Sequence, residues 1–138
     1  MFDWFTFHVA ALVLVAALFG GMLFFAALFA PMVFRKLPRE DAAAFMRAFF
    51  PTYHRTMGVV ALLAILPLAP QWSYGPEVAT LAAVAVGFIF ANTVLRPRID
   101  AARDSGDRSL FRRLHRASVI INMAQLVAVT VVLVRLAQ

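Results

Sequence analysis

Residues 5–34 read FTFHVAALVLVAALFGGMLFFAALFAPMVF, a long run in which no side chain carries a formal charge when His8 is neutral. A helix needs about 20 apolar residues to cross the hydrocarbon core of a bilayer, within a range of roughly 17–25. This stretch is therefore long enough to cross a membrane with some tilt. It also exceeds the apolar core of about 7–15 residues that is typical of a secretory signal peptide, so we expect it to be retained as a helix.

The composition of the whole chain indicates that lipid is its main solvent. Of its 138 residues 63% are hydrophobic and 14% are charged, with a mean hydropathy of +0.83. An ordinary soluble domain is about 45–50% apolar and about 25% charged. A soluble protein of this size could not bury so much apolar surface, which excludes a water-soluble globule and a disordered tail. Cysteine is absent, so disulfides, thiolate metal sites and cysteine nucleophiles are excluded as well.

Three further apolar stretches follow the first. In lipid every backbone N–H and C=O group must be bonded internally, so each stretch is expected to be a helix. We predict an all-α fold in which residues 1–138 form one domain, a four-helix transmembrane bundle with up-down connectivity. The predicted spans are about 5–34, 53–70, 78–95 and 115–135.

The connection between the first two spans is basic and partly amphipathic. Residues 42–50 have the pattern of a short interfacial helix. Pro51 lacks a backbone donor and disfavours helical geometry in the residue before it, so we expect a break or kink at Phe50.

The basic residues are distributed unequally between the connections. Lys and Arg number 13 against 7 Asp and Glu; five lie in the first connection and seven in the third, which leaves only Arg135 on the other side. Cytoplasmic loops of membrane proteins carry an excess of Lys and Arg. We therefore expect both basic connections to be cytoplasmic and both termini to lie outside, in a bacterial inner (plasma) membrane. The same rule explains the net charge of +6 without a nucleic-acid partner.

The predicted fourth helix carries a polar stripe. His115, Ser118, Asn122 and Gln125 are spaced by 3, 4 and 3 residues, which places them on one helix face that runs towards the bilayer centre. Polar side chains are costly in hydrocarbon and usually face the bundle interior. Two interpretations stay open. The amides could hold helices together, at roughly 0.6–2 kcal/mol for each hydrogen bond, or the stripe could line a cavity.

Polar residues on two other spans extend this pattern. Asn92 and Arg96 lie four residues apart on the third span, and Arg96 could reach Asp100 one turn further on. Tyr53 and His54 begin the second span. We predict that Tyr53, His54, Asn92 and Arg96 line the cavity opposite the stripe, where amides would orient a ligand and imidazoles would bind an ion or relay protons.

Small residues form a ridge on the third span, at positions Thr80, Ala83, Gly87 and Ala91. Small side chains let membrane helices approach closely, and Gly20 and Gly21 have the same effect on the first span. We interpret both sets as packing devices.

A soft metal ion is one candidate ligand. His54 and His115 lie at the predicted cytoplasmic ends of their helices, and Met57 follows His54 by three residues. Imidazole and thioether ligands suit Cu(I), so His54, His115 and Met57 form a candidate copper site. The alternative is that Met57 fills an apolar core and the histidines contact headgroups. The sequence has no HExxH, CxxC or glycine-rich phosphate loop to support zinc hydrolysis or nucleotide binding.

Four separated motifs, in order, resemble those of one family. The chain resembles the transmembrane-protein-205-like family, also called domain of unknown function 4149, over nearly its whole length. The resemblance implies a four-helix integral membrane protein and brings no settled biochemical activity. Arg116 departs from the pattern, because family members often have glycine there. The motifs are Gly20–Gly21 with PMVFRKL at 31–37, FFPTYH at 49–54, Asn92 with Arg96–Pro97, and Phe111, Leu114–His115, Ser118 and Asn122.

The first span is also similar, more distantly, to the HemJ-type protoporphyrinogen oxidase and the CopD-type copper-resistance domain. Both place a histidine near the start of the first helix, as His8 is placed here. This similarity implies a b-type haem protein with His8 as an axial ligand. HemJ-type proteins also use a lysine on a later helix, whereas Lys36, the one lysine of this chain, lies in a predicted loop.

Three functional hypotheses therefore stay open. The first is a non-enzymatic membrane protein, alone or as a homo-oligomer in the lipid bilayer, that handles or transports a metal ion or small solute through the polar site. The second is the haem b protein with His8 as ligand. The third is a structural or assembly protein whose polar stripe only packs helices. No catalytic residue is predicted, since Ser118 has no nearby Asp to complete a triad.

Overall fold

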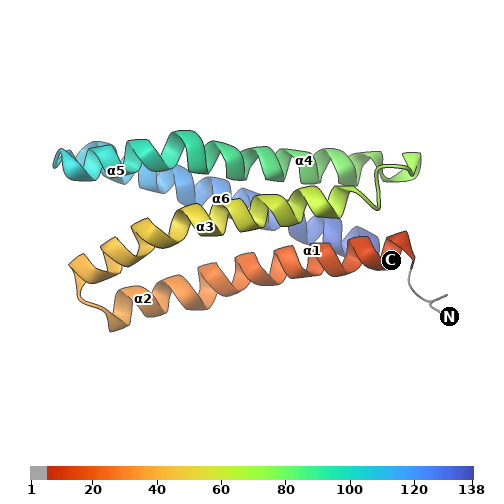
Figure 1. Ribbon diagram of the computed structural model, residues 1–138, viewed down its shortest axis with the longest axis horizontal. Coiled ribbons are helices and arrows are strands. Elements are labelled where there is room, and N and C mark those ends of the chain that lie inside the picture. Colours follow the sequence, from red (N-terminus) through yellow and green to blue (C-terminus); the bar gives the residue numbers. More distant parts are fainter. Residues whose placement is uncertain (1–5) are drawn as a thin grey trace.

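The computed structural model describes residues 6–138, which form four long helical stretches and contain no strand (Figure 1). The all-α fold is confirmed for this part of the chain. Phe5, the predicted start of the first span, lies outside it. The elements are α1 (Phe7–Phe24), the π-helical η1 (Phe25–Phe29), α2 (Ala30–Lys36), α3 (Arg39–Ile65), the 3-10 turn η2 (Trp72–Tyr74), α4 (Gly75–Phe90), the π-helical η3 (Ala91–Leu95), α5 (Arg96–Asp104) and α6 (Arg108–Ala137).

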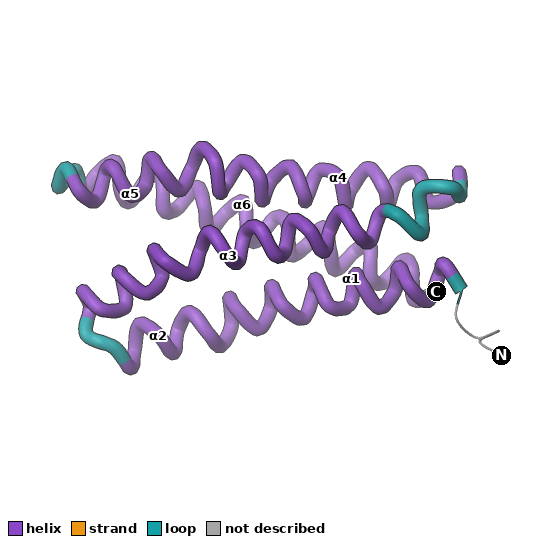
Figure 2. Tube along the Cα trace, viewed as in Figure 1, coloured by secondary structure: helices purple, strands orange, loops and turns teal. Residues whose placement is uncertain are grey.

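The four stretches run alternately up and down, joined by short loops at the two ends of the molecule (Figure 2). α3 packs against α1 and α4, and α6 packs against α1, α4 and α5. α6 crosses behind the bundle at an angle, from the α5 side at one end to the α1 side at the other (Figure 1). The helices therefore surround a common interior. Within it α6 packs along α1 but diverges from α2.

Three stretches are long and apolar enough to cross a membrane: Phe7–Lys36, Trp72–Asp104 and Arg108–Ala137. This places the protein in a lipid bilayer. α3 is not among them, because its first half is rich in charged and polar residues. The crossing of the membrane by α3 stays a prediction.

The predicted break at Phe50 is wrong, and the kink given as its alternative stays a prediction. α3 continues from Arg39 to Ile65 with Pro51 inside it, so residues 42–50 belong to the same helix as the second span. Proline removes one backbone hydrogen bond, but neighbouring helices make this loss tolerable in membrane helices. Here Phe50 before the proline and Tyr53 after it both pack on the aromatic ring of Phe25, which holds the helix on both sides of the proline.

Each of the two π-helical segments is followed by a proline at the same distance. The N–H of Ala30 bonds the carbonyl of Phe25, five residues back, and the N–H of Arg96 bonds the carbonyl of Ala91. Pro31 and Pro97 come directly after these donors. Proline cannot continue the regular hydrogen-bond ladder, and a wider turn relieves the clash of its ring with the preceding turn.

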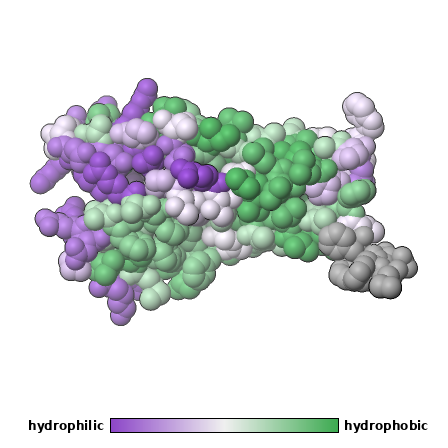
Figure 3. Space-filling view, in the orientation of Figure 1, coloured by the Kyte–Doolittle hydropathy of each residue, from purple (hydrophilic) through white to green (hydrophobic). Residues whose placement is uncertain are grey.

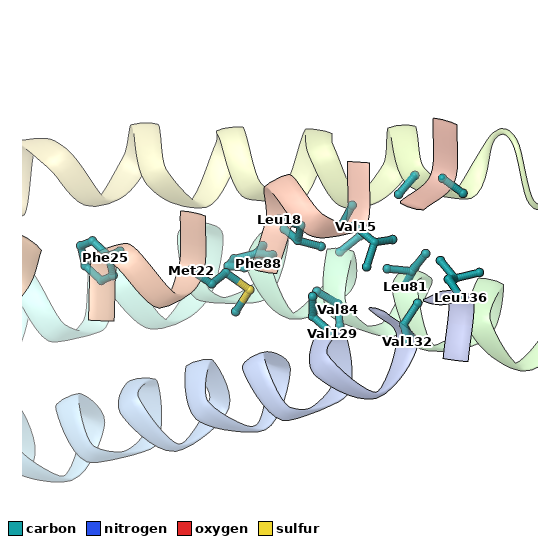
Figure 4. Close-up of a cluster of buried hydrophobic side chains, with 14 of the residues drawn as sticks. Val15, Leu18, Met22, Phe25, Leu81, Val84, Phe88, Val129, Val132 and Leu136 are labelled. Atoms are coloured by element: carbon teal, nitrogen blue, oxygen red, sulfur yellow. The ribbon is translucent and has the colours of Figure 1, made fainter. Parts of the chain in front are cut away.

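Most of the core lies in the half of the bundle away from the charged loops, and Phe25, Met46 and Tyr53 extend it into the other half. Figure 4 shows ten of its side chains by name. All buried residues of α6 fall between Gln125 and Leu136, and α2 has none. The half that contains α2, α5 and the first part of α6 is therefore much more open. The core includes Val15, Leu18 and Met22 of α1, Leu81, Val84 and Phe88 of α4, and Val129, Val132 and Leu136 of α6.

Hydrophilic residues gather at the end of the bundle that holds the 37–38 and 105–107 loops, which we call the charged end (Figure 3). Arg135 lies at the opposite end, where its Nε is 2.5 Å from Oε1 of Glu77, a carboxylate with only 4% exposure. The predicted separation of basic residues is thus present in space. Which end faces the cytoplasm stays a prediction.

Gln125 fixes the contact of α4 with α6. Its Nε2 donates to the carbonyl oxygen of Val84 at 2.8 Å. A Cβ atom at Gly87 would lie 2.6 Å from that same nitrogen. The small residue predicted at this point of the ridge therefore makes room for a buried amide.

We expect Gly87→Ala to lower the free energy of unfolding by about 1–3 kcal/mol, because the added methyl group displaces the Gln125 amide from Val84. Gly20→Ala is the matched control, since nothing lies within 4 Å of its Cβ position. Thermal unfolding in detergent measures both. In a Gly87→Ala/Gln125→Ala double variant the two losses should not add. A Gly87→Ala variant as stable as Gly20→Ala would contradict the contact.

The topology can be tested with single cysteines, because the chain has none of its own. We expect a membrane-impermeant maleimide to label Ser73→Cys in intact right-side-out spheroplasts. Leu37→Cys and Ser105→Cys, at the charged end, should be labelled only after lysis, because basic loops stay cytoplasmic. Labelling of Leu37→Cys and Ser73→Cys from the same side would show that α3 does not cross the membrane.

Candidate functional site

The open half of the bundle encloses a cavity of about 260 Å³ between all four helical stretches. It begins at the charged end and stops where the packed core begins, at the level of Gln125. The lining residues are Phe25, Ala26, Ala30, Phe34, Ala43, Met46, Arg47, Phe50, Tyr53, His54, Ala91, Arg96, Ile99, Asp100, Arg103, Phe111, His115, Ser118, Val119, Ile121, Asn122, Met123 and Gln125.

Most of the polar residues predicted from the sequence line this cavity. They are Tyr53, His54, Arg96, His115, Ser118, Asn122 and Gln125. Asn92 lies beside the cavity, where its Oδ1 accepts a hydrogen bond of 3.3 Å from Nε of Arg96. The polar stripe of α6 and Arg96 of the third span thus face the cavity, as expected for groups that hydrocarbon solvates poorly.

Two predicted residues lie elsewhere. Met57 packs against α1, where its Cε would be 2.9 Å from a Cβ atom at Gly21. His8 lies at the opposite end, with its Nδ1 3.1 Å from the hydroxyl of Tyr74. Among the described residues there is no group of three His, Cys, Asp or Glu side chains placed to hold a metal ion. Met57, unlike His54 and His115, does not line the cavity, and the copper site of these three residues stays a prediction.

His54 is the exceptional polar group of the cavity. Its side chain has only 8% exposure, and its Nδ1 is buried without a hydrogen-bond partner. The ring stacks on Phe50, with 5.6 Å between centroids and 24° between planes. A buried polar group without a partner costs about 1–3 kcal/mol, so nearly all such groups in proteins are satisfied.

Three members of the polar set already form hydrogen bonds across helices. The hydroxyl of Tyr53 donates to Oδ1 of Asn122 at 3.2 Å, which joins α3 to α6. The Gln125 amide joins α6 to α4 through Val84. These two contacts match the interpretation that the polar stripe packs helices. His54, on α3, makes no such hydrogen bond through Nδ1.

An aromatic cluster forms one wall of the cavity. Phe25 of η1 stacks on Tyr53 with 4.2 Å between ring centroids, and on Phe49 with 5.6 Å and 7° between planes. Phe29 lies 4.8 Å from Phe49. Aromatic pairs at such distances add about 0.5–1.5 kcal/mol each beyond their buried area, so this wall is rigid.

Charged residues surround the cavity at its outer end. Three guanidinium groups line it, from Arg47, Arg96 and Arg103, against one carboxylate, Asp100. Arg96 and Arg47 each approach Oδ2 of Asp100 to 3.5 Å, which confirms the predicted Arg96–Asp100 contact. Arg47 also donates two hydrogen bonds to Asp104, of 3.0 and 2.8 Å.

Arg103 is placed differently from the other two cations. Its guanidinium lies over the ring of Phe111, 5.0 Å from the centroid, and within residues 6–138 it forms no ion pair. The outer end of the cavity therefore has an excess of positive charge.

The π-helical turns align the cavity wall. Phe25 and Ala30 both line the cavity, as do Ala91 and Arg96, and each pair is separated by five residues. In an α-helix, residues five apart point about 140° away from each other. One π turn places them above one another, so the same helix face continues from the core into the open half.

The sequence analysis missed the charged and aromatic part of the lining. Arg47, Phe50 and His54 are spaced by three and four residues, which is the same signal that identified the stripe on α6. The expected break at Phe50 hid this signal, because a break would place Arg47 and His54 on separate helices.

A model of the family described as domain of unknown function (DUF4149) matches residues 13–108. The comparisons with curated proteins and with solved structures found no match. The matched region extends from α1 to the first residue of α6, so it covers three of the four cavity walls and leaves out the polar stripe. Because this region is more than half of the chain, the protein belongs to the DUF4149 family.

Proposed function

We propose that this is a four-span integral membrane protein that binds a small solute in the cavity of its open half. The charged end faces the cytoplasm of a bacterial inner membrane, and both ends of the chain lie on the other side. Three long apolar stretches and the concentration of basic residues at one end support this arrangement. The protein acts by binding, without a catalytic step.

His54 carries the proposal. A bundle that only packs its helices would be more stable with an apolar side chain at this position, because the buried Nδ1 has no partner. A solute that hydrogen-bonds to Nδ1 would satisfy it. Ser118 and His115 line the same cavity and are available to the same solute.

The geometry favours a solute over the two cofactors suggested by the sequence. A haem ligated by His8 would lie at the end opposite the charged end, where His8 contacts Tyr74, and His8 does not line the cavity. Met57, the thioether expected in a copper site with His54 and His115, packs on α1 and does not line the cavity. Elemental analysis of the purified protein tests the metal alternative. Copper in near-stoichiometric amount would support it over a solute.

The cavity reaches only part of the way across the bundle. Beyond Gln125 the core closes it with fully buried side chains such as Leu81 and Val129. Binding from the charged end therefore needs no large rearrangement. Transport to the other side would require the core half to open, and the proposal does not depend on it.

We expect His54→Leu to raise the thermal stability of the purified protein, because a polar group without a partner is replaced by an apolar side chain of similar size. Asn122→Leu is the control and should lower stability by about 1–3 kcal/mol, since it leaves the Tyr53 hydroxyl without its partner. Thermal unfolding in the same detergent compares them. If His54→Leu loses as much stability as Asn122→Leu, His54 is a packing residue and the proposal loses its support.

The cavity should also be accessible from water. We expect Ser118→Cys to react with a negatively charged, membrane-impermeant methanethiosulfonate applied at the charged end. Val127→Cys, on a face that is 64% exposed and apolar, should stay unmodified, because a thiol in hydrocarbon does not ionise. Mass spectrometry of protein in nanodiscs measures the modification. An unreactive Ser118→Cys would mean that the cavity is closed to water and the proposed function is wrong.

A further inference from the structure

We propose that the solute is an anionic amphiphile, a molecule with a carboxylate or phosphate head group on an alkyl chain, which enters the cavity sideways from the bilayer between α2 and α6. This inference rests on the proposed function and specifies the chemistry of its ligand. The head group would bind between the guanidinium groups and His54, and the chain would extend through the opening into lipid.

The first argument is the side opening. α6 packs against α1 in the core half but against α5 at the charged end, while α2 packs against α3 (Figure 1). No residue of α2 is buried, and none of α6 before Gln125. Both helices nevertheless contribute to the cavity lining, so the cavity wall is incomplete between them.

The second argument is the chemistry of the two edges. Phe34 of α2 is 54% exposed, and Val119 and Met123 of α6 are 44% and 39% exposed, and all three line the cavity. Ala26 and Ala30 continue the α1–α2 edge with small side chains. A polar solute would gain nothing from these edges, whereas an alkyl chain can cross them without leaving an apolar environment.

The third argument is size. The cavity of about 260 Å³ is larger than an engineered protein cavity of about 150 Å³ that binds benzene. This is room for a head group and a few methylene groups, and a whole lipid does not fit. A ligand of the bilayer must therefore keep most of its chain outside, and the side opening is where the chain can go.

The fourth argument is charge. The lining carries three arginines and one aspartate, and Arg103 has an aromatic ring but no carboxylate as its partner in the described chain. Guanidinium groups bind carboxylate and phosphate oxygens in a fixed, bidentate geometry. An imidazole Nδ1–H at the inner end would supply a further donor, from His54.

The test uses Ser118→Cys in nanodiscs of zwitterionic phosphatidylcholine, with the rate of methanethiosulfonate modification as readout. We expect oleate, oleoyl lysophosphatidate or both to slow the modification at least about fivefold. Protection by only one of them identifies carboxylate or phosphate as the head group. Ser105→Cys, in the exposed loop of the charged end, should keep its rate, which controls for repulsion of the reagent by charged lipid.

Two further probes separate the parts of the ligand. Oleyl alcohol has the chain without the anion, and acetate has the anion without the chain, so neither should protect Ser118→Cys. Arg103→Gln and Arg96→Gln, each combined with Ser118→Cys, should raise the half-protecting concentration of oleate about tenfold, as expected for a lost charge-assisted hydrogen bond. Arg103 is exposed, so its replacement leaves the bundle folded.

The outcomes distinguish this inference from the proposed function. Protection by acetate, equal protection by oleyl alcohol, or no protection by either anionic amphiphile would overturn the inference, while a reactive Ser118→Cys would leave the solute-binding cavity standing. Wild-type protection in both arginine variants would likewise overturn it. A Ser118→Cys that does not react without any ligand would defeat the proposed function and the inference together.

Discussion

The cavity depends on close packing in the half of the bundle that does not contain it. In that half, Val15, Leu18 and Met22 of α1 meet buried side chains of α4 and α6, and Gly87 lets the Gln125 amide reach the α4 backbone. Helices in lipid gain little from apolar burial, so such tight contacts and the hydrogen bond must hold them together. Once one half is fixed, the other half need not close, and α6 can diverge from α2.

Where α6 diverges from α2 a cavity opens, and the wider turns at η1 and η3 determine which side chains face it. Each inserts a five-residue step, from Phe25 to Ala30 and from Ala91 to Arg96, and each is followed directly by proline. Without this step, the charged half of each helix would be rotated by about 100° relative to the core half. The two prolines thus do more than remove a backbone donor each, because they favour the π-helical turns. The turn before Pro97 directs Arg96 inward.

Features of the structure that depend on the sequence of one helix could be predicted, whereas those that depend on contacts between helices could not. The helices, the separation of basic residues and the stripe from His115 to Gln125 follow from hydropathy and helical periodicity, and the structure contains all of them. The failure at Phe50 came from treating proline as a terminator, although the aromatic stacking of Phe49 and Phe50 on another helix outweighs one lost hydrogen bond. The sequence left two interpretations of Met57 open, and its packing on the core beside Gly21 matches the apolar one.

The polar side chains of the cavity differ in whether they have a hydrogen-bond or ion-pair partner. Tyr53 and Asn122 satisfy one another, and Gln125 bonds a backbone carbonyl, so these three stabilise the bundle with or without a ligand. His54 lacks a partner for Nδ1, and Arg103 lacks an anion within the described residues. In water an open half lined with phenylalanine would collapse, but in a bilayer acyl chains can fill the gap beside α2 at little cost. The bilayer that stabilises the opening would also be the source of the ligand. The ligand needs an oxyanion that can bind His54 and Arg103, which have no such partner within the described residues.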